Sequence, residues 1–387
     1  MYKFLIIALS FALFFSCTDK TPSFRSEEKN GIVYAKNKNI PNNPKLNYKL
    51  TPLFSIETTL KHFYMGGLKR FITIDKSSGL IYVLDPKTFT IKGYNMSGKL
   101  ECEFGGKGFG PGELGEKLGD NINGINSIYI EDNKVYVLNY SQNKLDVFEL
   151  NGKFIESIES PFKKDYRKGW ITHNYAISSL GGSKFLEIIS EFKLKKVGVS
   201  SREFCIKISL IDIDDVESGK IQLLNHEIEN SNNDWYHILG QRFTFSDDHI
   251  FIPKNSKDIF EIDVYDMSGI KTMNISKSYR HIRYPLVYRT SLKWNFDREA
   301  ILDIQVDRFD NLWISSSEDN EMEKITDNSQ VQIFDNKGKY LNLIKLNTNL
   351  IVANFFFLGD KLFIYGFEKS DEDQNYILRA YDYEIVE

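Results

Sequence analysis

The chain contains 387 residues, of which 42% are hydrophobic and 14% aromatic, and its formal net charge at pH 7 is −4. This length is enough for a large buried core, and the slightly acidic balance argues against a dedicated nucleic-acid-binding protein, which would carry a strong basic excess. Three cysteines are too few for a disulfide framework.

The N-terminus has the pattern of an export signal. Lys3 precedes an apolar stretch, Phe4–Phe15, which is too short to span a bilayer but fits the core of a signal peptide. The run Leu13-Phe14-Phe15-Ser16-Cys17 resembles a bacterial lipoprotein cleavage site, although Phe14 departs from the usual Leu. The resemblance implies a signal peptide at residues 1–16 and lipidation of Cys17. An ordinary N-terminal anchor or a non-lipidated signal is the alternative.

Residues 17–45 are polar, contain three prolines and show no sustained hydrophobic periodicity. We therefore predict a flexible polar tether, whose root-mean-square reach at this length is about 30 Å. Residues 46–387 contain no apolar run long enough for a transmembrane helix. We expect them to form one domain that the lipid anchor holds in the cell envelope, at the outer membrane, on either its periplasmic or its surface side.

One turn recurs four times in this domain. An aromatic residue ends a β-rich run, a small or polar residue and a glycine follow, and another β-rich run begins. The copies are Tyr94–Lys99, Phe148–Lys153, Tyr265–Ile270 and Phe334–Lys339. The glycine supplies the positive φ angle that a tight hairpin needs. The aromatic residues lie 54, 117 and 69 residues apart, and such spacing with several strands per repeat predicts a β-propeller rather than a sandwich.

The pattern predicts an all-β fold of six blades, each with four antiparallel strands, A to D, and with the recurring hairpin between C and D. The β-rich runs assign blade one to 70–104, blade two to 124–159, a stretched blade three to 175–224, blade four to 241–275, blade five to 301–346 and the three remaining runs of blade six to 351–383.

The last blade lacks a D strand, because the chain ends after its third β-rich run. We expect the β-rich segment 48–59 to supply that strand, which closes the ring and removes an exposed sheet edge. Cys102 and Cys205 fall in the non-adjacent blades one and three, too far apart for a disulfide, so we predict free thiols.

The glycine-rich run Phe104–Leu114 resembles the blade-joining signature of NHL-type repeats. Together with Ile56-Glu57-Thr58-Thr59 and the aromatic-x-x-x-Gly-Lys hairpins, it is similar to the six-bladed β-propeller lipoproteins of bacterial envelopes. The likeness covers most of residues 45–387, although the joining signature is clear only once. It implies a fold and a location, because that family has no single activity to carry over.

Motifs for known chemistry are absent from the sequence. The glycine-rich run does not fit a phosphate-binding loop, because Pro111 stands where that loop requires lysine, and we interpret it as a crossover between blades. HExxH, paired CxxC and GxSxG motifs do not occur, and the six histidines are scattered singly. Asp307 and Asp310 flank the A-to-B turn of blade five, where turn hydrogen bonding is the simpler role. We predict no catalytic residue and no cofactor, although a divalent metal in the axial channel stays open.

The predicted insertions fall in the D-to-A and B-to-C connections, which leave the same end of the ring. They span 160–172, 191–202, 226–240, 277–300 and 318–328. Long connections on a rigid scaffold commonly carry binding function, and aromatic and basic side chains favour binding hot spots. The resulting candidates for ligand binding are Tyr166, Arg167, Trp170, Trp235, Tyr236, His237, Tyr279, Arg280, His281, Arg283, Tyr284 and Trp294. The alternative for each is that it covers the ends of the inner strands.

We therefore expect a lipid-anchored envelope propeller that binds a carbohydrate, an anionic ligand or an envelope protein on its long-loop face. The alternative is a metal-dependent propeller enzyme of the lactonase, lyase or hydrolase kind with a site in the axial channel. That alternative predicts Asp, Glu, Asn or His side chains from at least three A strands converging near the axis. A structural subunit of an envelope complex is the third possibility.

Overall fold

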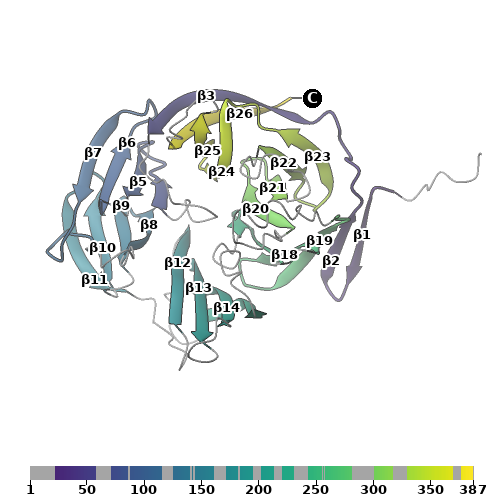
Figure 1. Ribbon diagram of the computed structural model, residues 1–387, viewed down its shortest axis with the longest axis horizontal. Coiled ribbons are helices and arrows are strands. Elements are labelled where there is room, and N and C mark those ends of the chain that lie inside the picture. Colours follow the sequence, from purple (N-terminus) through teal and green to yellow (C-terminus); the bar gives the residue numbers. More distant parts are fainter. Residues whose placement is uncertain are drawn as a thin grey trace, which may run out of the picture.

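The computed structural model describes residues 22–57, 71–85, 88–115, 125–139, 142, 144–160, 171–181, 184–194, 202–212, 220–230, 243–254, 256, 258–280, 300–316, 329–368 and 376–386. They form a ring of six blades, each built on four antiparallel strands, so the predicted β-propeller is confirmed (Figure 1). Within these residues, no helix is long and apolar enough to cross a membrane.

The blades follow one another around the ring in sequence order. From the inside outward, blade one contains β4 (Ile72–Ile74), β5 (Ile81–Asp85), β6 (Thr90–Tyr94) and β7 (Leu100–Gly105); blade two β8 (Ile125–Glu131), β9 (Lys134–Asn139), β10 (Lys144–Glu149) and β11 (Phe154–Glu159); and blade three β12 (Ile171–Gly181), β13 (Lys184–Leu194), β14 (Arg202–Asp212) and β15 (Lys220–Asn230). Blade four contains β16 (Thr244–Phe245), β17 (His249–Pro253), β18 (Phe260–Asp266) and β19 (Lys271–Lys277); blade five β20 (Ile301–Val306), β21 (Leu312–Ser316), β22 (Gln330–Phe334) and β23 (Tyr340–Lys345); and blade six β24 (Leu350–Leu358), β25 (Lys361–Glu368), β26 (Tyr376–Val386) and β3 (Asn47–Glu57).

The ring closes as expected, through an N-terminal strand in the last blade. Strand β3 pairs antiparallel with β26, from Asn47 opposite Val386 to Glu57 opposite Ile377. The first and last parts of the domain therefore share one sheet, at the top of Figure 1.

The predicted tether contains structure that the sequence analysis missed. Strands β1 (Phe24–Lys29) and β2 (Ile32–Asn37) form a hairpin, and β2 pairs in parallel with β19 at the outer edge of blade four. The prediction of a flexible tether is therefore wrong for residues 24–37. The reason is a non-local contact: Ala35 is fully buried against the hydrophobic cluster between blades four and five.

The N-terminal segment 22–57, which we call the N-terminal belt, ties three blades together. Its hairpin lies on blade four, the backbone N–H of Asn42 and Asn43 donates to blade five at Tyr340 and Leu341, and β3 completes blade six. The Asn37 side chain donates to Ser276 and Gly338 and accepts from the Tyr340 N–H, at 3.1, 2.8 and 2.8 Å. The belt thus connects blades four, five and six, next to the sheet in which the ring closes.

The recurring hairpin has a role in packing as well as in turning the chain. Its glycine has a positive φ in every copy and lies against the outermost strand of the preceding blade. The pairs are Gly98 with Phe54, Gly152 with Phe104, Gly269 with Ile221 and Gly338 with Ile275. In three copies the first turn residue (Asn95, Asp266 or Asp335) accepts hydrogen bonds from the backbone N–H groups two and four residues later. The motif therefore recurs because each blade must turn tightly where it meets its neighbour.

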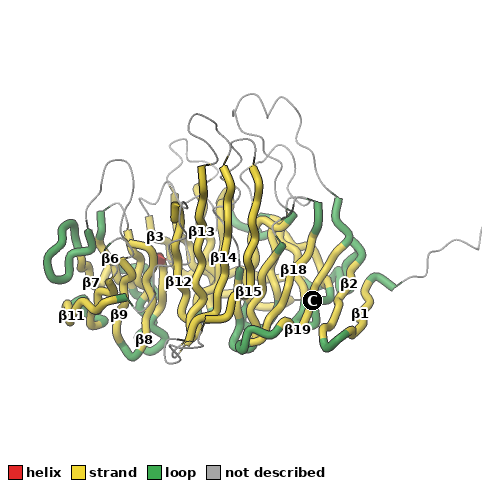
Figure 2. The backbone as a smooth tube through the Cα atoms, turned by 90° about the horizontal axis from the view of Figure 1, so that it is seen from below, coloured by secondary structure: helices red, strands yellow, loops and turns green. Residues whose placement is uncertain are grey.

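Blade three differs from the other blades in the length of its strands. All four contain 11 residues, and Figure 2 shows β13, β14 and β15 extending beyond the strands of neighbouring blades. Residues 226–230, which we predicted as part of an insertion, are the end of β15, and residues 171–172 belong to β12. The A-to-B and C-to-D turns are short in the blades whose turns are described. Cys102 and Cys205 form no disulfide, as predicted.

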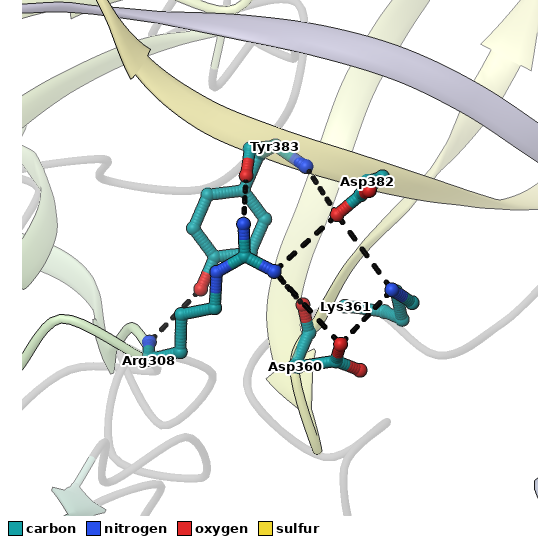
Figure 3. Close-up of polar contacts among 5 residues, drawn as sticks. All are labelled: Arg308, Asp360, Lys361, Asp382 and Tyr383. Carbon is teal, nitrogen blue, oxygen red and sulfur yellow. Dashed lines mark hydrogen bonds and ion pairs between the residues drawn. The ribbon is translucent and has the colours of Figure 1, made fainter.

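A polar contact group on the A-to-B side locks blade five to blade six (Figure 3). The guanidinium of Arg308 lies 4.6 Å from the ring centre of Tyr383, contacts its carbonyl oxygen, and lies 3.4 Å from Asp382. The backbone N–H of Arg308 donates to the Tyr383 hydroxyl at 2.9 Å. Lys361 pairs with Asp360 at 3.0 Å. These contacts join a turn of blade five to the closing sheet.

Candidate functional site

The innermost strands carry buried polar residues in an otherwise apolar setting. They are Ser127 on β8, Thr244 on β16, Asp303 and Gln305 on β20, and Asn354 on β24. Each is at least nine-tenths buried. We call these five residues the inner polar set. Figure 1 shows β8, β20 and β24 around the middle of the ring, so these strands of the set lie nearest the propeller axis.

Three members follow a β-bulge at the same place in their blades. The register between strands A and B shifts between Ile125 and Ser127, between Ile301 and Asp303, and between Val352 and Asn354. A bulge redirects the side chain that follows it, and bulges are over-represented beside active sites. The three polar residues therefore occupy equivalent positions in blades two, five and six, two residues or more into the A strand from its D-to-A end.

In blades five and six the polar residues lie on the face directed at the next blade. Gln305 pairs with Trp313, which packs in the cluster between blades five and six, and Asp303 lies two residues before Gln305 on the same face. Asn354 lies two residues before Phe356, which packs against blade one. Apolar residues at the alternate positions of the same strand, such as Ile304, point to the other face and pack against the preceding blade.

Blades two and four show the same arrangement. Ser127 shares its face with Tyr129, which packs against blade three. Thr244 pairs with Phe251, which packs against blade five. The inner polar set is thus a repeated feature: one or two polar side chains on the same face of the inner strand in four blades.

Several polar atoms of this group have no hydrogen-bond partner in the described part of the chain. They include Ser127 Oγ, Thr244 Oγ1 and Gln305 Oε1, and also Ser315 Oγ on β21, opposite Asp303. The buried Asn354 side chain also makes no hydrogen bond with described residues. A buried polar group without a partner costs about 1–3 kcal/mol, so its recurrence on the inner strands of several blades indicates that something else satisfies these groups.

Asp303 is the one charged member of the set. Its Oδ1 accepts hydrogen bonds from its neighbour's backbone, Ile304 N–H at 2.8 Å, and from Gln305 Nε2 at 3.3 Å. This contact orients the Gln305 amide so that its oxygen is the free end. Among the described residues, no group of three or more His, Cys, Asp or Glu side chains could hold a metal ion. Among the described side chains of the A strands, the set includes one Asp, on β20, and one Asn, on β24.

Two of the residues predicted from the sequence are described, Tyr279 and Arg280. They follow β19 at the start of the D-to-A connection that leads to β20. Tyr279 is half-buried against the cluster between blades four and five, so part of its role is to cover the core, whereas Arg280 is exposed. The remaining candidates lie outside the described residues: Cys17, Tyr166, Arg167, Trp170, Trp235, Tyr236, His237, His281, Arg283, Tyr284 and Trp294.

Sequence reasoning missed the inner polar set because it searched the connections and not the strands. A signal was present, since polar residues interrupt apolar β-rich runs in Ile301-Leu302-Asp303-Ile304-Gln305-Val306 and in Ile351–Leu358. A polar residue in a strand covered on both faces is unexpected unless it has a partner.

Comparisons with known proteins agree on the fold. No family model and no curated protein sequence matches the chain. Among solved structures it is similar to a member of the DUF4221 family from Bacteroides vulgatus, at 10% identity and a TM-score of 0.50, over 88% of this chain and 99% of that one. It is also similar to virginiamycin B lyase from Staphylococcus aureus, at 13% identity and a TM-score of 0.40, over 86% and 99% of the two chains. A gluconolactonase from Xanthomonas campestris matches at 12% identity and a TM-score of 0.40, over 86% and 96%. At 10% identity the likeness to the DUF4221 structure shows the propeller fold alone.

Proposed function

We propose that this protein is a lipid-anchored, cell-envelope β-propeller that binds a ligand at the end of the ring where the D-to-A connections enter the inner strands. The inner polar set forms the floor of the proposed site, and Arg280 lies at the start of one connection above it. The observation that carries the proposal is the repeated placement of unpartnered, buried polar atoms on equivalent faces of the inner strands.

An unpartnered buried hydroxyl lowers the stability of the fold, but it is needed if it binds a ligand. This difference gives the proposal a specific test. Removing an unpartnered hydroxyl from Ser127 or Thr244 takes away a desolvation cost and breaks no hydrogen bond in the protein. The variants Ser127→Ala and Thr244→Val should therefore match or exceed the parent in thermal stability. A residue kept for binding is expected to show this combination of neutral or improved stability and lost function.

The experiment is a thermal-shift screen of the purified protein against neutral glycosides, acidic sugars and divalent metal salts, repeated with the double variant Ser127→Ala/Thr244→Val. We expect one class to raise the melting temperature of the parent and not of the variant. The control is Ser157→Ala on β11, whose hydroxyl bonds the buried Asp146 far from the axis. It should lower stability and keep the ligand shift. A shift that survives in the double variant, or no shift from any class, contradicts the proposal.

The proposal of a lipid anchor rests on the sequence of the first 17 residues. The position of β1 implies a shorter tether between that anchor and the folded domain than the sequence analysis expected. Because β1 begins at Phe24, the chain between Cys17 and the hairpin extends at most about 25 Å. This is less than the reach expected for a tether of residues 17–45. Cys17→Ser should move the protein from the membrane to the soluble fraction, whereas Cys102→Ser should leave it at the membrane. Membrane retention of Cys17→Ser would show that lipidation of this residue is not the anchor.

A further inference from the structure

We infer that the ligand of the inner polar set is an uncharged, hydroxyl-rich molecule of the sugar class, and not an anion. The inference rests on the proposed site and narrows what it binds. It follows from the donors and acceptors that Ser127, Thr244, Gln305 and Asn354 offer, and from the charges that the inner strands lack.

The open groups require a partner that both donates and accepts hydrogen bonds. Ser127 Oγ and Thr244 Oγ1 can each do both, and Gln305 Oε1 accepts. The buried Asn354 side chain carries one amide oxygen and one amide nitrogen. A ligand hydroxyl also donates and accepts, so a ring that carries several hydroxyls can satisfy groups on several blades. An ammonium ion only donates and would leave the Asn354 nitrogen unpaired.

The charge of the inner strands disfavours an anion. Strands β4, β8, β16, β20 and β24 contain no Lys, Arg or His, and the one charged member of the inner polar set is the Asp303 carboxylate. An anion at this floor would be desolvated beside a like charge with no cation from these strands to compensate it. The sixth inner strand, β12 of blade three, differs in that it contains one histidine, His173.

The contact between Asp303 and Gln305 fixes which atom of the Gln305 amide is available to a ligand. Asp303 Oδ1 holds the amide nitrogen of Gln305, so the unpartnered oxygen of that amide points away from the carboxylate and awaits a donor. A site with fixed, buried acceptors strongly rejects ligands that lack the matching O–H or N–H, because the acceptors then stay unpaired.

The test uses probes that differ in charge at one position. Methyl glucoside, methyl galactoside and methyl mannoside are each compared with the corresponding methyl uronate and methyl 2-amino sugar, by titration calorimetry with the purified protein. We expect at least one neutral glycoside to bind, with its uronate at least about tenfold weaker. We expect the double variant Ser127→Ala/Thr244→Val to lose the neutral glycoside and to keep the parent melting temperature.

The outcomes separate the ligand class from the site. If a uronate or an amino sugar binds as tightly as its neutral partner, and the double variant no longer binds it, the ligand is not restricted to uncharged sugars. That result overturns the inferred ligand class but still supports the proposed site. Binding that the double variant retains overturns the site as well. No binding by any of the neutral glycosides also overturns the inference.

Discussion

The hydroxyl of Tyr48 donates a hydrogen bond to the buried carboxylate of Asp307 at 3.0 Å, and so joins the closing strand to a turn of blade five. Trp313 Nε1 donates to the same carboxylate oxygen at 2.9 Å, and Asn311 Nδ2 donates to the Tyr48 hydroxyl at 3.1 Å. Residues 259 positions apart in the chain therefore share one buried hydrogen-bond network at the seam of the ring.

Tyr48→Phe should destabilise the protein by about 1–3 kcal/mol, because it leaves the buried Asn311 amide and the Asp307 carboxylate each one partner short. The measurement is urea-induced unfolding followed by tryptophan fluorescence, since Trp313 lies in the network. Tyr34→Phe on β2 is the control, because the Tyr34 ring is only half-buried and its hydroxyl makes no hydrogen bond with described residues. Equal effects of the two variants would show that the Tyr48 network adds nothing to closure.

The same carboxylate predicts a pH dependence. Burial raises the pKa of Asp307 above its ordinary value, although hydrogen bonds from Asn311, Trp313, Phe309 and Tyr48 oppose the shift. A carboxyl group with a raised pKa favours folding most when it is protonated, so its contribution is lost as the pH rises through the folded-state pKa. The free energy of unfolding of the parent minus that of Asp307→Asn should therefore decrease from about pH 3.5 upward and then level off. An increase of this difference over the same acidic range would contradict the assignment.

Gly338 tests why the recurring hairpin requires glycine. Its φ is +73°, and a Cβ atom would lie 2.8 Å from Ile275 Cγ1 and 2.9 Å from Ala35 Cβ. Gly31, in the turn between β1 and β2, has a similar φ of +76° but no atom within 4 Å of such a Cβ. Gly338→Ala should therefore cost more than Gly31→Ala, which reports the backbone strain alone, about 1 kcal/mol. Equal unfolding midpoints for the two variants would exclude a packing role for Gly338.

Asn37 tests the N-terminal belt. Its amide pairs with three backbone groups of blades four and five, so Asn37→Ala should cost about 1–3 kcal/mol and raise the sensitivity of residues 22–46 to proteolysis. The control is Asn336→Ala, an exposed asparagine in the blade-five hairpin with no side-chain hydrogen bond to described residues. Unchanged proteolysis in Asn37→Ala would mean that the hairpin is held by its strand pairing alone.

Local patterns explain which parts of the fold could be predicted. The aromatic-x-x-x-Gly hairpins and the closing strand carry their signals within a few residues, because turn geometry and strand composition are local properties. The hairpin β1–β2 was missed although Asn30-Gly31, both with positive φ, is a strong hairpin signal. Its first strand, Phe24–Lys29, is almost entirely polar, and the contact that holds the second strand comes from β19, far along the chain.

The inner polar set could not be predicted from periodicity for a different reason. The inner strands are buried on both faces, so alternation carries no information about which face a residue occupies. The bulges before Ser127, Asp303 and Asn354 then shift the phase within each strand. Asp307, by contrast, lies in a turn with a recognisable pattern, and its predicted hydrogen bonds to the turn are confirmed at Phe309 and Asn311 N–H.

The most direct test of the proposed site is a crystal structure of the protein grown with the neutral glycoside that binds best in the titrations. The account predicts a sugar on the propeller axis, with hydroxyls in hydrogen-bond distance of Gln305 Oε1, Asn354 and at least one of Ser127 and Thr244. A glycoside bound away from the axis, or an inner polar set satisfied only by ordered water at saturating glycoside, would contradict it.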